Sequence, residues 1–150
     1  MGDLIKAKIS GLALDITTNS PVVVLKPEDS KSEDEDRVLP IWIGHFEAMA
    51  IAMSLSNVTQ QRPMTHDLIR LVLEGFGSHV EKVAITELKE QTFYAVIYVE
   101  RDGKLIQIDS RPSDSIAVAL RCDAPIYVNS DLFHLDKSED APEVSRMLKR

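Results

Sequence analysis

Polar side chains capable of chemistry gather in two short stretches of the sequence, each at the predicted start of a helix. The first stretch is Arg62-Pro63-Met64-Thr65-His66-Asp67, in which Thr65 is the predicted N-cap. A helix N-terminus offers free N–H groups that suit a phosphate, and Arg62 can add a bidentate grip on it. His66 can accept or donate a proton near neutral pH. In the alternative interpretation, Asp67 only stabilises the helix dipole and His66 is exposed.

The second stretch is Asp109-Ser110-Arg111-Pro112-Ser113-Asp114, at the junction of a predicted strand and a largely apolar helix. Asp109 at the strand end and Asp114 one turn into the helix can converge on a hard cation such as Mg²⁺ or Mn²⁺. Arg111 can neutralise charge that develops on a phosphoryl oxygen. In the alternative interpretation, Arg111 pairs with Asp114 and the hydroxyl groups cap free helix amides.

A third carboxylate, Glu47, follows Gly44 at another predicted helix start. It is either a further metal ligand or a first-turn acid that favours the helix dipole. The sequence contains no phosphate loop, zinc-spaced set of Cys and His, nucleophile elbow or dinucleotide fingerprint. Any chemistry must therefore come from carboxylates, histidines, arginines and backbone amides.

Hydrophobic periodicity and turn residues predict the strands and helices that position these groups. The predicted strands are Ile5–Leu14, Val22–Leu25, Val38–Ile43, Val80–Leu88, Thr92–Arg101, Lys104–Ser110 and Ile126–Val128. Helices are predicted at Phe46–Leu55, from Thr65 to the glycines Gly75 and Gly77, and at Pro112–Arg121. Asp102-Gly103 indicates a hairpin turn, and Pro40 favours an edge strand or the start of a strand. The helix at 46–55 is apolar nearly all round, so we expect it to be buried.

Length and charge limit the architecture. A chain of 150 residues can bury one core, so we predict a single compact α+β domain at 1–135, a mixed β-sheet packed with about three helices. The net charge of −7 resides in an acidic loop at 27–37 (−4), which we expect to be mobile, and in the acidic stretch at 136–143 (−3), which opens an acidic-to-basic tail at 136–150. The remainder is neutral, so a nucleic acid must be held by local contacts rather than by a broad basic surface.

The sequence also indicates a location. No apolar run approaches the roughly 20 residues of a membrane span, so we expect no membrane contact. The single cysteine, Cys122, cannot form an internal disulfide. We therefore expect a cytoplasmic protein.

Two segments resemble each other at a spacing of 67 positions, with Ile41 aligned to Ile108 and Glu47 to Asp114. Each is a strand that runs into an alanine-rich helix with a carboxylate early in the helix. Internal duplication and chance similarity of small apolar residues both explain the match. If duplication is the cause, Glu47 and Asp114 occupy equivalent positions.

Five blocks of sequence, in order along the chain, resemble the bifunctional nuclease family of bacteria and plants. The blocks are Leu39–Gly44, Glu47-Ala48, Arg62–Leu68, Thr92–Ala95 and Ile108–Ala117. Small departures from the family pattern are Met64, Ser110 and the Glu90-Gln91 turn. The resemblance implies a compact α+β protein that self-associates as a homo-oligomer and has nuclease activity on DNA and RNA.

Clusters and resemblance together predict a phosphodiesterase that acts on DNA or RNA. The expected ligands of Mg²⁺ or Mn²⁺ are Asp109, Asp114 and Glu47, and the expected catalytic groups are His66, Asp67, Arg62 and Arg111. Contacts to the nucleic acid are expected from Arg62, Thr65 and Ser113. The alternative is a non-catalytic module in which the same clusters bind an anion or a partner protein. We expect the cluster around His66 and the cluster at 109–114 to meet in space.

Overall fold

The computed structural model describes residues 2–29 and 37–135. Most of the predicted acidic loop at 27–37 and the whole tail at 136–150 lie outside the described residues. The described strands are β1 (Leu4–Asp15), β2 (Ser20–Pro27), β3 (Arg37–Trp42), β4 (His79–Lys89), β5 (Thr92–Arg101), β6 (Lys104–Ser110), β7 (Ile126–Asn129) and β8 (His134–Leu135). The described helices are α1 (His45–Leu55), α2 (Thr65–Gly75), α3 (Pro112–Cys122) and a 3₁₀ turn at Ser130–Leu132. Within residues 2–29 and 37–135, no helix has the length and apolarity that a membrane crossing requires.

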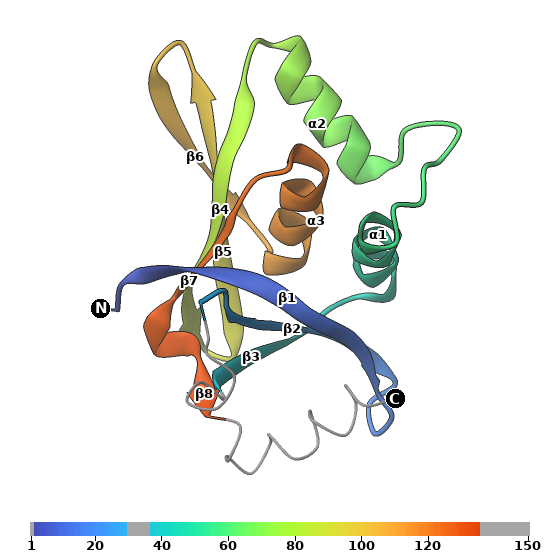
Figure 1. Ribbon diagram of the computed structural model, residues 1–150, viewed down its shortest axis with the longest axis vertical. Coiled ribbons are helices and arrows are strands. Elements are labelled where there is room, and N and C mark those ends of the chain that lie inside the picture. Colours follow the sequence, from blue (N-terminus) through green and yellow to red (C-terminus); the bar gives the residue numbers. More distant parts are fainter. Residues whose placement is uncertain (1, 30–36, 136–150) are drawn as a thin grey trace.

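The strands form one sheet in the order β6-β5-β4-β7-β1-β2-β3-β8 (Figure 1). Neighbouring strands are antiparallel except β4 and β7, which are parallel, so the predicted mixed sheet and the α+β class are confirmed. On its outer side β3 pairs with β8 only at Arg37 and Val38. Pro40, which has no N–H to donate, pairs with Val24 of β2 on one side and has no strand partner on the other side among the described residues, as the edge alternative predicts.

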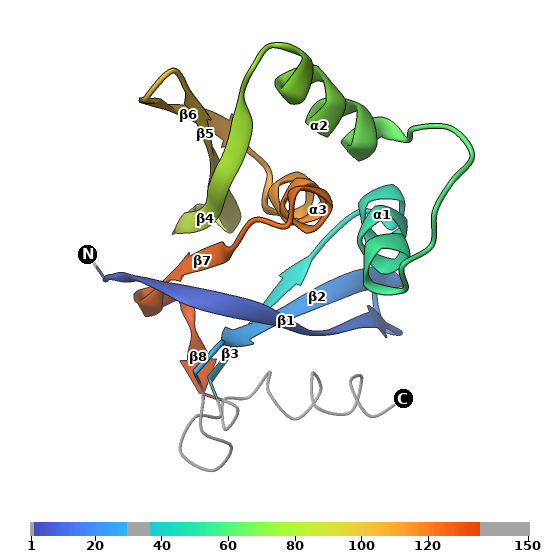
Figure 2. The ribbon, with the colours of Figure 1, turned by 45° about the horizontal axis from the view of Figure 1, so that its top comes forward.

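The helix α3 lies at the centre of the fold, in the angle between the two halves of the sheet (Figures 1 and 2). It packs against β4 and β5 and contacts both other helices. Its residues from Ile116 to Ala119 are fully enclosed, and the alanines among them allow close approach of the neighbouring elements. Pro112 opens the helix at its first turn, where the missing N–H costs no hydrogen bond.

The helix α1 is more exposed than its sequence predicts. Ala48, Ala50 and Ile51 are buried, but Phe46 is 82% exposed and Met49 is 54% exposed. The prediction of a buried helix at 46–55 is therefore wrong. The reason is position, because α1 packs on α3 and β2 from the outside (Figure 2). An apolar sequence indicates that a helix has surfaces to bury. It does not indicate which of several helices lies at the centre of the fold.

Two units with the same order of elements make up most of the fold, β1-β2-β3-α1 and β4-β5-β6-α3. Arg37 and Lys104, which begin β3 and β6, are 67 positions apart, and so are His45 and Pro112, which begin α1 and α3. In the sheet, the two sets of strands extend in opposite directions from β7. The similarity at 67 positions therefore corresponds to a structural repeat.

Two hairpin turns of the second unit use left-handed backbone. Asp102 and Gly103 have φ angles of 51° and 77°, as a type I′ turn requires, so the predicted hairpin is confirmed. The turn between β4 and β5 has the same form, but its residues are Glu90 and Gln91, with φ angles of 49° and 65°. Long side chains with a Cβ are disfavoured there, whereas Asn and Gly are favoured.

Replacing Glu90-Gln91 by Asn-Gly should raise the free energy of unfolding by about 1–2 kcal/mol, because both new residues favour the backbone conformation already present. Urea unfolding measures the change. As a control, Gly103→Ala should lower stability by about 1 kcal/mol, since it puts a Cβ at a positive φ. An unchanged or lower midpoint for the Asn-Gly protein would contradict the argument.

Candidate functional site at the helix starts

The starts of α2 and α3 bring two of the predicted site residues into direct contact. His66, the second residue of α2, donates from Nε2 to Oδ1 of Asp114 over 2.9 Å. The two residues are 48 positions apart in the sequence. The expectation that the two polar clusters meet in space is confirmed.

The second oxygen of Asp114 is bound by Arg111. Nε and Nη2 of Arg111 each lie 2.9 Å from Oδ2 of Asp114. The same Nη2 lies 3.7 Å from Oε2 of Glu47 at the start of α1. Arg111 therefore bridges two carboxylates that hold equivalent places in the two repeated units. We refer to His66, Asp114, Arg111 and Glu47 as the helix-start cluster.

The imidazole of His66 is held in one orientation. His66 is only 7% exposed, so the alternative expectation of an exposed histidine is wrong. A carboxylate can only accept a hydrogen bond, so the contact with Asp114 places the imidazole proton on Nε2. Nδ1 then carries a lone pair and has no hydrogen-bond partner among the described residues. Among the described residues, every fully buried side-chain nitrogen or oxygen has a hydrogen-bond partner. Nδ1 has none, so it must be accessible to solvent.

Asp67 is engaged through both carboxylate oxygens. Oδ2 accepts the N–H of Met64 over 2.9 Å, and Oδ1 accepts Nε–H of Arg121 over 2.9 Å. Met64 is therefore the N-cap of α2, and the prediction of Thr65 is wrong, because Asp67 reaches back to the amide that precedes the helix. The N–H of Met64, and next the charge of Arg121, lower the pKa of Asp67 against the opposing effect of burial. A catalytic role for Asp67 stays a prediction, since its contacts are structural.

Arg121 was not identified from the sequence, although it links all three helices. Besides its bond to Asp67 on α2, it donates from Nη1 to the carbonyl of Ala117 on α3 over 3.0 Å and from Nη2 to the carbonyl of Ala50 on α1 over 3.1 Å. Its side chain is 8% exposed. The signal that could have marked it is a cation in the last turn of an apolar helix.

The other predicted site residues lie around the helix-start cluster. Asp109 is exposed near the end of β6 and lines a groove of about 530 Å³ together with Arg111 and Asp114. Ser113 is buried and borders a smaller hollow beside Arg111. Arg62 is exposed in the loop before α2 and forms no ion pair within the described part of the chain.

The predicted metal ligands do not form a metal site in this arrangement. Across residues 2–29 and 37–135, no three side chains of His, Cys, Asp or Glu are grouped so as to hold a metal ion. Asp114 directs its two oxygens at His66 and Arg111, and the guanidinium contacts both Asp114 and Glu47. The ligand set Asp109, Asp114 and Glu47 stays a prediction.

The segment before α1 controls the position of Glu47. Asp15, at the end of β1, accepts hydrogen bonds from the hydroxyl of Thr17 over 2.7 Å and from the indole of Trp42 over 2.9 Å. These two bonds lower the pKa of Asp15 to about 2 and tie the end of β3 to β1. Two residues later, a Cβ on Gly44 would collide with the carboxylate of Glu47. The absence of a side chain at Gly44 therefore lets Glu47 fold back over the helix start.

Fold and site together define a one-domain α+β protein whose polar site is built from three helix starts. The chain belongs to the bifunctional nuclease family, because the model of the bifunctional nuclease domain matches residues 23–140. An uncharacterised protein of Mycobacterium tuberculosis is 42% identical over 123 residues, which are 82% of this chain and 70% of that protein. Bifunctional nuclease 1 of Oryza sativa subsp. japonica is 33% identical over 71% of this chain and 32% of its own length. Bifunctional nuclease 1 of Arabidopsis thaliana is 29% identical over 77% of this chain and 35% of its own length.

The variant Asp67→Asn should lower the free energy of unfolding by about 1–3 kcal/mol at neutral pH, because the buried guanidinium of Arg121 loses its carboxylate. A carboxyl group with a lowered pKa stabilises the fold above its ordinary pKa of about 4, and this contribution is lost as the pH falls through the lower folded value. The difference between variant and wild type in urea unfolding should therefore shrink on acidification below pH of about 4.

The matched control for Asp67→Asn is Asp123→Asn. Asp123 is exposed at the end of α3 with a φ of 53°, a conformation that Asn also tolerates. Its change should stay within about 0.5 kcal/mol. Equal effects of the two substitutions would contradict the role given to the Asp67–Arg121 pair.

Proposed function

We propose that this domain hydrolyses phosphodiester bonds of DNA or RNA at the helix-start cluster. The observation that carries the proposal is the 2.9 Å hydrogen bond from His66 to Asp114. A buried imidazole oriented by a carboxylate is the arrangement of a general base. Membership of the bifunctional nuclease family supports the choice of substrate.

His66 would act through its free nitrogen. With Nε2–H donated to Asp114, Nδ1 is ready to accept a proton from a water molecule as the water oxygen attacks phosphorus. The imidazolium that forms is stabilised by the negative charge of Asp114. The leaving sugar oxygen departs with the electrons of the broken P–O bond and takes a proton from the medium.

Arg111 would stabilise the charge that develops on the phosphoryl oxygens. Its side chain is 68% exposed, and Nε and Nη2 already bind Asp114. Nη1 has no partner within the described residues and can donate to a phosphoryl oxygen. Charge-assisted hydrogen bonds of this kind are stronger than neutral ones, and Asp114 and Glu47 keep the guanidinium plane oriented.

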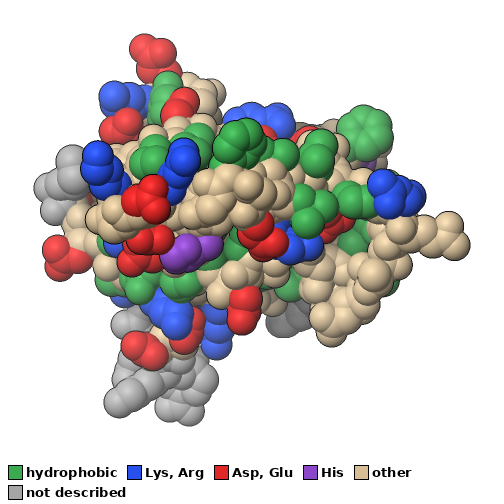
Figure 3. Space-filling view, turned by 90° about the horizontal axis from the view of Figure 1, so that it is seen from above, with side chains coloured by type: hydrophobic (Ala, Val, Ile, Leu, Met, Phe, Trp, Pro, Cys, Tyr) green, Lys and Arg blue, Asp and Glu red, His purple; other side chains and the backbone are tan. Residues whose placement is uncertain are grey.

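The charge distribution on the surface favours binding of the nucleic acid by a few local contacts. Seen from above, Lys and Arg side chains are interspersed with acidic ones (Figure 3), in keeping with the net charge of −7. A broad basic surface, which supplies most of the affinity of a duplex binder, does not cover this face. Arg62, Thr65 and Ser113 remain the predicted contacts to the nucleic acid.

His66 and Arg111 can perform these roles without contact to a metal ion. Asp109, Asp114 and Glu47 stay the predicted ligands of Mg²⁺ or Mn²⁺. Binding at Asp114 would require the guanidinium of Arg111 to move away, because it occupies Oδ2. Cleavage measured with Mg²⁺, with Mn²⁺ and with EDTA tests whether the ion belongs to the reaction.

His66→Gln should lower the rate of cleavage of a labelled oligonucleotide by about 10²–10⁴-fold, because the general base is lost. Asp114→Asn should lower it by a similar factor, since an amide can no longer hold the imidazole proton on Nε2. Asp114→Asn should also cost about 1–3 kcal/mol of stability in EDTA, because Arg111 and His66 lose a charged partner. A gain in stability would instead favour the metal-ligand role of Asp114.

The rate measurements need protein freed of contaminating nucleases, and Asp123→Asn serves as the control for a carboxylate outside the cluster. If His66→Gln and Asp114→Asn cleave as fast as the wild type, the proposed mechanism is wrong. If the purified wild type binds oligonucleotides without cleaving them under any metal condition, the alternative of a non-catalytic anion-binding module is correct.

Self-association as a homo-oligomer, which the family resemblance implies, also stays a prediction. The helix α2 exposes Leu68 and Val72, and the residue after it exposes Phe76. Exposed apolar groups of this size are common at interfaces. Light scattering on the purified chain should give a multiple of the 16.8 kDa chain mass. A mass of one chain across the concentration range would contradict the prediction.

A further inference from the structure

A second hollow lies outside the helix-start cluster, between the end of α1, the loop that follows it, the start of α2 and the end of α3. Its volume is about 490 Å³, which is within the range of sites for small molecules. None of His66, Asp114, Arg111 and Glu47 lines it. We refer to this hollow as the loop pocket.

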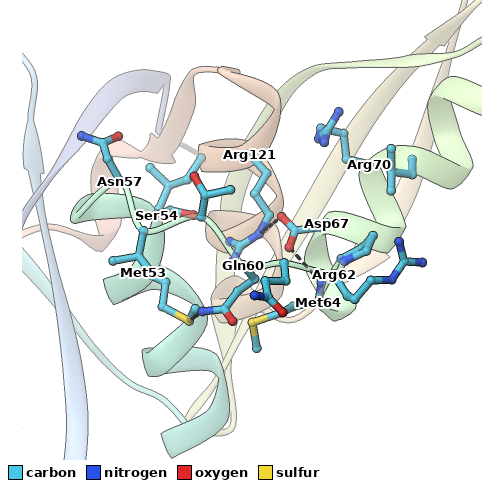
Figure 4. Close-up of a pocket in the computed structure, with 15 residues that line it drawn as sticks. Met53, Ser54, Asn57, Gln60, Arg62, Met64, Asp67, Arg70 and Arg121 are labelled. Carbon is cyan, nitrogen blue, oxygen red and sulfur yellow. Dashed lines mark hydrogen bonds and ion pairs between the residues drawn. The ribbon is translucent and has the colours of Figure 1, made fainter.

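The wall of the loop pocket contains an internally balanced ion pair. Arg121 and Asp67 are joined by the 2.9 Å bond described above, and the other nitrogens of Arg121 donate to backbone carbonyls. Figure 4 shows this pair at the inner side, with Arg62 extending away from it. The pair stabilises the wall and leaves no free charge for a ligand.

Two further arginines line the loop pocket, and one of them gives it a positive character. Arg70 binds Glu74 through Nη1 over 3.1 and 3.2 Å, so its charge is largely offset. Arg62 lines the pocket and has no acidic partner within residues 2–29 and 37–135. In a chain of net charge −7, an unpaired cation at a hollow favours an anionic ligand.

The remaining lining combines apolar surfaces with side-chain amides. Met53, Met64 and Leu71 supply the apolar part, and Asn57, Gln60 and Gln61 supply the amides. Among the described residues, the one hydrogen bond of the Gln60 side chain goes to the sulfur of Met53, at 3.9 Å, so its amide remains available to a ligand. Thioether and aliphatic groups pack well on planar rings, and amides can hydrogen-bond to both the donors and the acceptors of a base edge.

We propose that the loop pocket binds one nucleotide of a single-stranded substrate, with its base between the apolar groups and the amides and its phosphate at Arg62. The inference rests on the proposed function for the identity of the substrate. A hollow of this size takes a single base, which must therefore be unstacked and unpaired. Asp67 connects the two sites, because it lines the loop pocket and directly follows His66 in α2.

The test uses the full chain, titrated by calorimetry and by amide NMR with adenosine monophosphate, uridine monophosphate, adenosine and inorganic phosphate. We expect the nucleotides to bind more tightly than either adenosine or phosphate, with shifts of amide signals in the loop between α1 and α2. Arg62→Gln should weaken nucleotide binding about tenfold, the effect of one charge-assisted hydrogen bond, and leave adenosine binding unchanged. The matched control is Arg101→Gln, which replaces an exposed arginine at the last position of β5 and should change neither affinity.

Three results would overturn the proposal. They are nucleotide affinity unchanged by Arg62→Gln, phosphate binding as tight as nucleotide binding, and amide shifts confined to elements other than the loop pocket. The proposal also states that the substrate is single-stranded. The Asp114→Asn protein should therefore bind a short single-stranded oligonucleotide more tightly than the corresponding duplex, and equal affinities would contradict this preference. Nucleotide binding in a wild-type protein that cleaves nothing would refute the proposed function and leave this site standing.

Discussion

The guanidinium of Arg121 holds the three helices in the arrangement on which both polar sites depend. It is nearly buried, and its three bonded nitrogens reach one group on each of α1, α2 and α3. A buried guanidinium needs a carboxylate and further hydrogen-bond acceptors, because otherwise the cost of removing its charge from water destabilises the fold. Asp67 supplies the charge and the two carbonyls supply the rest. Because Asp67 also accepts the N–H of Met64, the N-cap of α2, the same set of bonds fixes the start of the helix from which His66 reaches Asp114.

The repeat explains why the helix-start cluster has two carboxylates in equivalent places and one histidine. Glu47 and Asp114 are each the third residue of a helix that follows an edge-side strand. Only the second unit carries an arginine before its helix, since Gly44 stands 67 positions before Arg111. Arg111 therefore forms ion pairs with both carboxylates. The histidine comes from α2, which lies between the two units in the sequence, so the symmetry of the repeat is broken at the point where chemistry is proposed.

The sequence predicts local features such as strands and turns well. It predicts poorly which helix is buried at the centre and which residue caps a helix. Alternation and the Asp102-Gly103 turn predict β5 and β6 closely, because these signals depend on neighbouring residues. The contact of His66 with Asp114 was expected from two polar helix starts in one small domain. The exposure of α1 is not expected from the sequence, because hydrophobic periodicity does not indicate which helix lies at the centre of the fold. The sequence does not identify Arg121, because its carboxylate partner is 54 positions away. It predicts Thr65 as the cap because propensity ignores the carboxylate of Asp67, which binds the N–H of Met64 three residues before it.

The bond between Asp15 and Trp42 has an optical consequence. Trp42 is the single tryptophan of the chain, and its indole nitrogen is bound to a carboxylate at the joint between β3 and α1. Indole emission is sensitive to the charge and polarity beside the ring, so tryptophan emission, excited at wavelengths that the three tyrosines do not absorb, reports on this joint alone. An unlabelled sample therefore carries its own probe of the segment that orients Glu47.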